Sequence, residues 1–464
     1  RSNEMVRKVT MKEMPGVGLI PVIDPRIDTI TEKKILDKLR LDSKVRELGF
    51  EVVFSAEAVK TEDEAVNKVR EMERAGVSSI IFFTTWFLRA NVVVGASRST
   101  GLPVMLWSIP DMDNTSLIGY GVAHGSLDET GISHETVCGP WDENARRKMT
   151  AWIKACHAKK KISGSRYGDI GGSCLSMLTG VSDPNQWRRK FGIGVESAEQ
   201  WTLINKARLI KERDVSCYVK KWKEEFKSVD VSDDVLKKSA KLYLAGKKMF
   251  AENGWDFAGV KCQFELIDNY LAPCLPIALW NDEGYTVACE TDMNAALTMY
   301  ALNCLGAGPV MFSDIQYIDY EERWARFLNC GTAATFLAGG RKNVTLKDCP
   351  EVQGTYDEKK RKHLCKGGAC TSFVLPPGDV TLARFGRIEG RYVLHLSKGE
   401  SFEYHHDEKS LLGIGGSWPF AYVKIKESLD TFCVNLRAHH MCIAFGDWVP
   451  EMKILAKLWN VELL

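Results

Sequence analysis

The chain has 464 residues, which is enough for two or three domains with a large core. A hydrophobic content of 45% and a charged content of 26% are ordinary for a water-soluble globular protein. The formal net charge of +2 argues against nucleic acid or an anionic membrane as a bulk partner. The first residues lack the apolar stretch of a secretory signal, and no apolar run is long enough to cross a bilayer. We therefore expect a cytoplasmic protein.

The fourteen cysteines are scattered and mostly stand within apolar runs. That usage is typical of small buried hydrophobic residues in a reducing compartment. One local cluster, HLCKGGAC, brings His363, Cys365 and Cys370 close together in the sequence. Its spacing fits no common zinc pattern, so it favours a loop over a metal site.

Apolar runs alternate with amphipathic stretches over residues 16–110. Strands are predicted at 16–24, 50–55, 77–84 and 102–108, and helices at 30–49 and 61–76. This order predicts a parallel sheet with helices on both faces. No G-x-G-x-x-G fingerprint follows the first strand, so the sequence gives little support to a dinucleotide site.

A helix near 142–160 leads into a second unit of the same kind. An amphipathic helical region covers 198–250, and the apolar runs AGVKCQF, YTVAC and GPVMFS then read as strands. From about residue 345 the composition changes to Gly, Pro and alternating apolar residues, which indicates antiparallel strands. The predicted fold is α/β, with two doubly wound parallel-sheet domains at 1–160 and 161–342. A β-rich domain at 343–464 follows them.

Three acids stand where strands of the middle unit are predicted to end. Glu265 follows AGVKCQF, Asp292 follows YTVACET and Asp314 follows GPVMFS. Ligands of open α/β sheets collect beyond the carboxyl ends of the strands, so these acids could share one rim and bind a cation. The competing interpretation is structural, because an Asp before MNAALTM is a natural helix N-cap. Glu265 fits that interpretation less well, since it stands between apolar neighbours where an unpaired carboxylate would be costly to bury.

Tandem histidines, His439 and His440, precede the apolar run MCIAF. Successive residues of a strand point to opposite faces, so we expect at most one of the two rings to join a site. Carboxylates with one imidazole suit Mn²⁺ or a similar divalent ion such as Mg²⁺ or Co²⁺. Such an ion polarises adjacent sugar oxygens and lowers the barrier to C–H deprotonation, and carboxylates can move the proton.

Several stretches together resemble the L-fucose isomerase / L-arabinose isomerase family. ACETDMNAALTM is similar to the family's acid–Asp–helix motif, and RAHHMCIAFGD to its late His motif. PVIDPRI, TTWFLRAN, NCGTAA and SWPF agree with further family segments in the same order. The matches run from about residue 20 to the C-terminus.

The resemblance implies a set of site residues. It places the metal ligands at Glu265, Asp292 and His440, with Glu265 and Asp292 also acting as the proton-transfer pair, and it makes Glu290 a structural neighbour. The resemblance also implies substrate contacts, and these fall on Arg26, Trp86, Asp314, Trp418 and His439. It further implies a homo-trimer or homo-hexamer in which Arg26 and Trp86 complete a neighbour's pocket.

The function expected from these features is metal-dependent aldose–ketose isomerisation of a free sugar of the fucose or arabinose type. The proton would pass through a cis-enediol between Glu265 and Asp292. One alternative keeps this chemistry on an acidic or sulfonated hexose such as sulfoquinovose. A second alternative is a non-catalytic sugar-binding protein, because two α/β lobes also suit hinge-type binding proteins.

Overall fold

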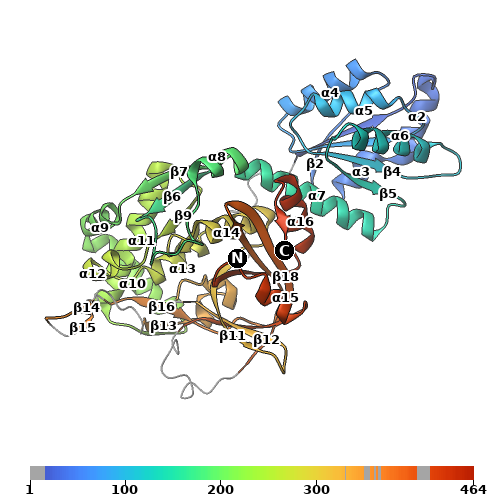
Figure 1. Cartoon of the computed structure of the whole chain (residues 1–464). Coiled ribbons are helices and arrows are strands. Elements are labelled where there is room, and N and C mark those ends of the chain that lie inside the picture. Colours follow the sequence, from blue (N-terminus) through green and yellow to red (C-terminus); the bar gives the residue numbers. More distant parts are fainter. Residues whose placement is uncertain (1–15, 330, 350–355, 360–361, 364–366, 405–417) are drawn as a thin grey trace. The chain divides into compact units, whose positions relative to one another are not determined.

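The computed structural model describes residues 16–329, 331–349, 356–359, 362–363, 367–404 and 418–464 (Figure 1). The described residues divide into two compact units, one formed by residues 16–160 and the other by the described residues of 161–464. Cys330, Cys365 and residues 405–417 lie outside the described residues.

The N-terminal unit is built on a five-stranded parallel sheet in the order β2-β1-β3-β4-β5. Its strands are β1 (Gly16–Val22), β2 (Glu51–Phe54), β3 (Ile80–Thr84), β4 (Val104–Ser108) and β5 (His134–Cys138). Its helices are α2 (Thr29–Leu39), α3 (Leu41–Arg46), α4 (Glu62–Arg74), α5 (Ala90–Arg98), α6 (Ser116–Glu129) and α7 (Glu143–Ile162). Strand β3 is buried on both faces, which explains its continuous apolar run IIFFT.

Two helix predictions in this unit had different outcomes. Helix α4 begins as predicted, with a capping box in which Thr61 and Glu64 satisfy each other's backbone N–H groups. The single helix predicted over 30–49 is instead two helices, because Arg40 has a left-handed φ of 47°. Leu41 and Val45 are the buried residues of the second helix.

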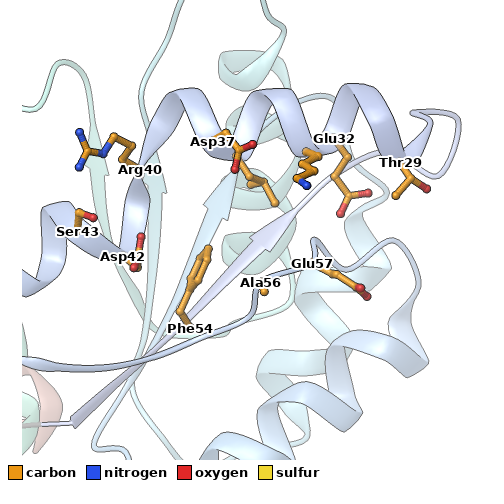
Figure 2. A pocket seen from close by; sticks show the side chains of 11 residues that line it. Thr29, Glu32, Asp37, Arg40, Asp42, Ser43, Phe54, Ala56 and Glu57 are labelled. Atoms are coloured by element: carbon orange, nitrogen blue, oxygen red, sulfur yellow. The ribbon is translucent and has the colours of Figure 1, made fainter.

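A cavity of about 660 Å³ lies beside the edge strand β2 (Figure 2). Helix α2 lines one side with Glu32 and Asp37, and Phe54 and Glu57 line the other. Glu32 pairs with Lys60 at 2.8 Å and accepts a hydrogen bond from the Ala58 N–H. None of the residues predicted to form the site lines this cavity.

The second unit contains a four-stranded parallel sheet in the order β10-β9-β6-β7. Its strands are β6 (Arg166–Ile170), β7 (Gly194–Ala198), β9 (Phe257–Val260) and β10 (Thr286–Cys289). The helices of this region are α8 (Pro184–Phe191), α9 (Gln200–Leu209), α10 (Glu212–Glu225), α11 (Asp233–Asn253), α12 (Glu265–Asn269), α13 (Cys274–Asp282) and α14 (Met293–Leu305). A small sheet joins β8 (Ser228–Asp230), β13 (Thr345–Asp348) and β16 (Ala369–Ser372), and β14 (Tyr356–Asp357) pairs with β15 (Lys362–His363).

The same unit contains a seven-stranded sheet in the order β17-β20-β11-β12-β19-β18-β21, and β17 also pairs with β18. Its strands are β11 (Met311–Asp319), β12 (Trp324–Leu328), β17 (Gly378–Ile388), β18 (Arg391–Ser401), β19 (Phe420–Ile425), β20 (His440–Phe445) and β21 (Glu462–Leu463). Short helices accompany it: α15 (Leu429–Val434), α16 (Val449–Leu458) and the 3₁₀ turns η1 (Thr335–Ala338) and η2 (Arg341–Asn343).

Helix α14 contacts both β-structures of this unit, namely β9 and β10 of the parallel sheet and β11, β17 and β20 of the larger one. Residues 293–302 are all buried, which accounts for the nearly uniform apolar sequence MNAALTMYAL. The N-terminus of α14 is therefore a point where elements of both sheets meet.

The predicted fold class is confirmed: parallel sheets with helices precede a C-terminal β-rich sheet. Strands β11 and β12 of that sheet precede residue 343, and the two sheets share one compact unit. A separate domain at 343–464 therefore stays a prediction. Among the described residues, every helix is too short or too polar to span a membrane.

Candidate active site

Asp292 is the N-cap of α14 and lies in a fully buried ion pair. Its Oδ1 accepts hydrogen bonds from the Ala295 N–H at 2.9 Å and from Nη2 of Arg384 at 3.0 Å. Its Oδ2 lies 2.8 Å from Nη1 of Arg384 and accepts a hydrogen bond from Nδ1 of His440 at 2.7 Å. The side chains of Asp292, Arg384 and His440 are 0%, 1% and 1% exposed.

The charge of Asp292 is therefore already balanced inside the protein. Burial by itself would raise the pKa of this carboxyl, but the Arg384 charge and the hydrogen bond from His440 outweigh burial and hold the pKa well below its usual value. Both oxygens have two close donors or charged partners, so neither offers an obvious lone pair to an ion. The structure supports the capping interpretation of Asp292 and adds a role in orienting His440.

The Nε2 atom of His440 lies between two carboxylates. It is buried without a hydrogen-bond partner, 3.6 Å from Oε2 of Glu290 and 3.5 Å from Oδ1 of Asp314. Because Nδ1 carries the proton donated to Asp292, a neutral His440 has its lone pair on Nε2. Metal ligands lie roughly 2.0–2.2 Å from an ion and hence about 3–3.5 Å from one another. The two distances from Nε2 to the carboxylate oxygens are close to that spacing.

Local backbone structure brings these three side chains together. Asp314 of β11 and His440 of β20 are direct cross-strand partners in the seven-stranded sheet. Glu290 comes immediately after β10 of the parallel sheet, and Glu290 and Thr291 both have left-handed φ values, of 59° and 48°. Such strained non-glycine conformations concentrate at functional sites. The bend at Glu290 turns the chain into α14 and leaves the Glu290 side chain 13% exposed beside His440.

His439 is also close to this cluster. A ligand atom of His439 lies within 4.8 Å of ligand atoms of Glu290 and His440, and its Nε2 is 3.7 Å from Oδ1 of Asp314. We expected the two histidines to face opposite ways, but β20 begins at His440, so strand alternation does not apply to His439. Burial and the neighbouring His440 lower the pKa of His439 to about 4.

Glu265 is placed differently from the other predicted ligands. Strand β9 ends at Val260, so four residues separate Glu265 from the strand end, and Glu265 opens the short helix α12. Its side chain is 61% exposed and pairs with Lys261 at 3.1 Å. The apolar neighbour Phe264 is itself 39% exposed, so no buried carboxylate needs a partner here. The geometry shifts the candidate ligand set from Glu265 and Asp292 to Glu290 and Asp314, with His440 retained.

Arg26 and Trp86 belong to the N-terminal unit, where they follow the adjacent strands β1 and β3. These strands form the topological switch point of the sheet, which is where open α/β sheets bind ligands. Arg26 is 76% exposed, and its Nε donates to Oδ1 of Asp24 at 2.7 Å. The structure therefore brings these two residues to one edge of one sheet.

Trp418 is buried in an aromatic cluster that contains an arginine not singled out by the sequence. Trp418 packs with Phe420 and Tyr422, and the guanidinium of Arg326 lies 4.3 Å from the centre of the Phe420 ring. Arg326 is 5% exposed, and its Nε and Nη2, like Nε1 of Trp418, have no hydrogen-bond partner in the structure. A sequence signal existed, since Arg326 interrupts the apolar strand WARFL.

The described residues of the HLCKGGAC cluster form no group of potential metal ligands. Cys370 is buried, and its Sγ lies 3.4 Å from the Lys347 carbonyl oxygen. Cys365 lies outside the described residues.

Comparison with known proteins supports one family. The sequence model of the L-fucose isomerase C-terminal domain matches residues 327–464. A sulfoquinovose isomerase from Alkalicoccus urumqiensis is 22% identical over 397 residues, covering 83% of this chain and 85% of the relative. An L-arabinose isomerase from Actinobacillus succinogenes is 25% identical over 223 residues, covering 44% of this chain and 43% of the relative.

Among solved structures, a periplasmic solute-binding protein from Actinobacillus succinogenes with bound D-allose is 11% identical. The match covers 62% of this chain and 91% of that protein, but its TM-score of 0.18 is too low to support a conclusion. The sequence motifs, the domain match and the sugar isomerase relatives agree with one another. The C-terminal domain match and the sugar isomerase relatives support a member of the L-fucose isomerase / L-arabinose isomerase family.

Proposed function

We propose that this aldose–ketose isomerase works at a divalent-metal centre formed by Glu290, Asp314 and His440. The observation that carries the proposal is the buried Nε2 of His440, which lies 3.5 and 3.6 Å from one oxygen of each carboxylate. A buried imidazole nitrogen without a hydrogen-bond partner is costly unless a ligand satisfies it.

The donor set suits a hard or borderline divalent ion. Two carboxylates and one imidazole favour Mn²⁺, with Mg²⁺ or Co²⁺ as alternatives. An ion bound there would polarise adjacent sugar oxygens and make a neighbouring C–H more acidic. Asp292 supports the centre from behind, because its hydrogen bond to Nδ1 directs Nε2 of His440 toward the two carboxylates.

In this proposal Glu290 and Asp314 have the proton-transfer roles that the family resemblance implied for Glu265 and Asp292. Their carboxylates approach the same imidazole nitrogen from two different sheets. A sugar lying against them would present its C1–C2 edge to both groups. One carboxylate can then remove the carbon-bound proton and the pair can return it to the adjacent carbon through a cis-enediol.

We further propose that the substrate is an acidic or sulfonated hexose, with Arg326 binding the anionic end. No described carboxylate pairs with Arg326, although its side chain is 5% exposed. A buried cation of this kind is unfavourable without a counter-ion. The sulfoquinovose isomerase relative covers most of the chain, which supports this choice over a neutral pentose or 6-deoxyhexose.

The position of Arg326 suits this role. Leu328 is the cross-strand partner of Asp314, and Arg326 is two residues from Leu328 on the same face of β12. Two residues of a strand span about 7 Å, which is comparable to the length of a six-carbon chain. A sulfonate could accept hydrogen bonds from Nε and Nη2 of Arg326 while the other end of the sugar lies at the metal centre.

Arg26 and Trp86 remain proposed substrate contacts supplied by a neighbouring subunit in a trimer or hexamer. Their position at the switch point of the N-terminal sheet supports ligand contact. Dissociated subunits should then be inactive, and Trp86→Ala should raise KM more than it lowers kcat.

A colorimetric ketose assay tests the proposed function. The purified chain is stripped with EDTA and supplied with L-fucose, L-arabinose or sulfoquinovose, with and without Mn²⁺. We expect ketose from sulfoquinovose only when the divalent ion is restored. Sugar binding without turnover under any ion would support the non-catalytic alternative, and preferred turnover of a neutral sugar would overturn the role of Arg326.

A further inference from the structure

A second cluster of metal-binding side chains lies in the N-terminal unit. His124 and Asp128 are one turn apart on α6, and His134 is the first residue of β5. Gly131, with a φ of 69°, reverses the chain between them, and the Ile132 N–H closes the turn on the Leu127 carbonyl at 2.9 Å. The turn therefore returns His134 to the face of α6 that carries the other two residues.

The ligand atoms of the three side chains converge on one point. Nδ1 of His124 lies 2.7 Å from Nε2 of His134 and 3.7 Å from Oδ2 of Asp128. One ligand atom from each residue lies within 4.8 Å of the others. Zinc ligands lie about 3.3 Å apart in a tetrahedral site, so the nitrogens need to separate by only about 0.6 Å. His124 is 41% exposed and Asp128 65% exposed, so both side chains have room to move.

The protonation of His134 also suits a metal ligand. Its Nδ1 lies 2.8 Å from the Ile132 carbonyl oxygen. A carbonyl oxygen can only accept, so Nδ1 carries the proton and the neutral ring has its lone pair on Nε2. A backbone carbonyl that orients one ring nitrogen while the other faces a ligand is the usual arrangement around metal-bound histidines.

The charges around the cluster favour a cation. The cluster lies at the C-terminal end of α6, where the helix dipole is negative. Glu129 is the neighbour in sequence of Asp128 and adds a further carboxylate at this end of the helix. Arg98 is a basic residue near the end of α6, and its Nη2 already donates to the Thr130 carbonyl at 3.0 Å.

We propose that His124, Asp128 and His134 form a second metal site, selective for Zn²⁺, that ties the end of α6 to the edge strand β5. Two imidazoles and one carboxylate, with an open position for water, suit Zn²⁺ better than Mn²⁺. The Glu290–Asp314–His440 centre has the opposite balance of oxygen and nitrogen donors. On binding, His124 gives up its Nδ1 proton and takes one on Nε2 from water, so its ring stays neutral.

Zinc binding to the full-length, EDTA-stripped chain tests this site separately from the isomerase centre. Zinc bound per chain is measured by mass spectrometry after gel filtration, and affinity by calorimetry. The variants are His124→Gln/His134→Gln, the isosteric Asp128→Asn and, for the other centre, Glu290→Gln. His157→Gln, a histidine of the same unit outside the cluster, is the matched control.

We expect His124→Gln/His134→Gln to lose one zinc equivalent that Glu290→Gln and His157→Gln retain. Its affinity should fall about 100-fold or more, since losing even a hydrogen-bond partner of a ligand usually costs 10–100-fold. Asp128→Asn should weaken binding without disturbing the fold, which circular dichroism checks. Equal zinc content in the wild type and His124→Gln/His134→Gln would overturn the site, and so would an unchanged affinity in Asp128→Asn.

Discussion

Strands β9 and β10 are neighbours in one parallel sheet, and each leads through an acid-bearing joint into a helix. After β9, Glu265 is 61% exposed and pairs with Lys261. After β10, the side chains of Glu290 and Asp292 are 13% and 0% exposed, at the buried start of α14. The difference comes from the elements opposite each joint, because β17 and β20 supply Arg384 and His440 only to the second one.

This comparison shows that an acid near a strand end becomes a candidate ligand only when another element covers it with complementary groups. The acids close to His440 also differ in their surroundings. Asp292 has its charge balanced by Arg384, whereas Glu290 and Asp314 face the unbonded Nε2 of His440.

Asp314→Asn should cause the largest loss of isomerase activity. Loss of a proton-transferring carboxylate typically costs about 100- to 10,000-fold in rate, and a metal ligand is lost as well. Steady-state ketose formation measures the effect. Asp319→Asn, at the other end of β11, is the matched control and should keep full activity, because its oxygen only accepts from the Glu321 and Glu322 N–H groups. Normal turnover by Asp314→Asn would remove Asp314 from the centre.

Asp292→Asn should lower stability rather than remove a reacting group. The free energy of unfolding should fall by about 3 kcal/mol, because Arg384 would be left as a buried cation without its counter-ion. Urea denaturation measures the change. A loss below about 1 kcal/mol, within the range of surface ion pairs, would mean that the Asp292–Arg384 pair is not structurally important.

Arg326→Met should separate sulfonated from neutral sugars. Hydrogen bonds to a charged group contribute about 1.5–3 kcal/mol, so kcat/KM for a sulfonated hexose should fall roughly 10- to 100-fold. Turnover of a neutral sugar should not fall. Arg391→Met removes a 77% exposed arginine from β18 and serves as the control. Equal losses on both substrates would show that Arg326 is structural.

Glu265→Gln should have the smallest effect. Its ion pair with Lys261 is exposed, and such pairs contribute about 0–1 kcal/mol. Thermal unfolding and ketose formation should both stay close to wild type. A large loss of turnover would restore Glu265 to the centre and contradict the contrast between the two joints.

Much of the fold could be predicted from periodicity. The apolar runs of β1, β3, β4 and β10 and the amphipathic pattern of α4 are local signals, and each led to the correct element. The break between α2 and α3 was missed because it depends on the left-handed conformation of Arg40, which local periodicity did not predict.

The candidate site could be predicted only in part. Asp292 was correctly recognised as a possible cap because capping depends on residues close in sequence. Its pairing with Arg384 depends on contact between α14 and β17, 92 residues apart in the chain. An arginine among the apolar residues of VTLARFGRI was a usable signal, since a buried guanidinium needs a carboxylate. Glu265 was expected at the end of the strand, but β9 already ends at Val260. Strand ends are among the least certain features of a sequence-based prediction.

Manganese binding by Glu290→Gln and Glu265→Gln, measured side by side by calorimetry on the EDTA-stripped chain, tests the centre most directly. We expect Glu290→Gln to lose Mn²⁺ affinity by about 100-fold or more and to form no ketose, while Glu265→Gln binds and turns over as the wild type does. The reverse pattern, with Mn²⁺ affinity lost in Glu265→Gln and kept in Glu290→Gln, would contradict the proposed centre.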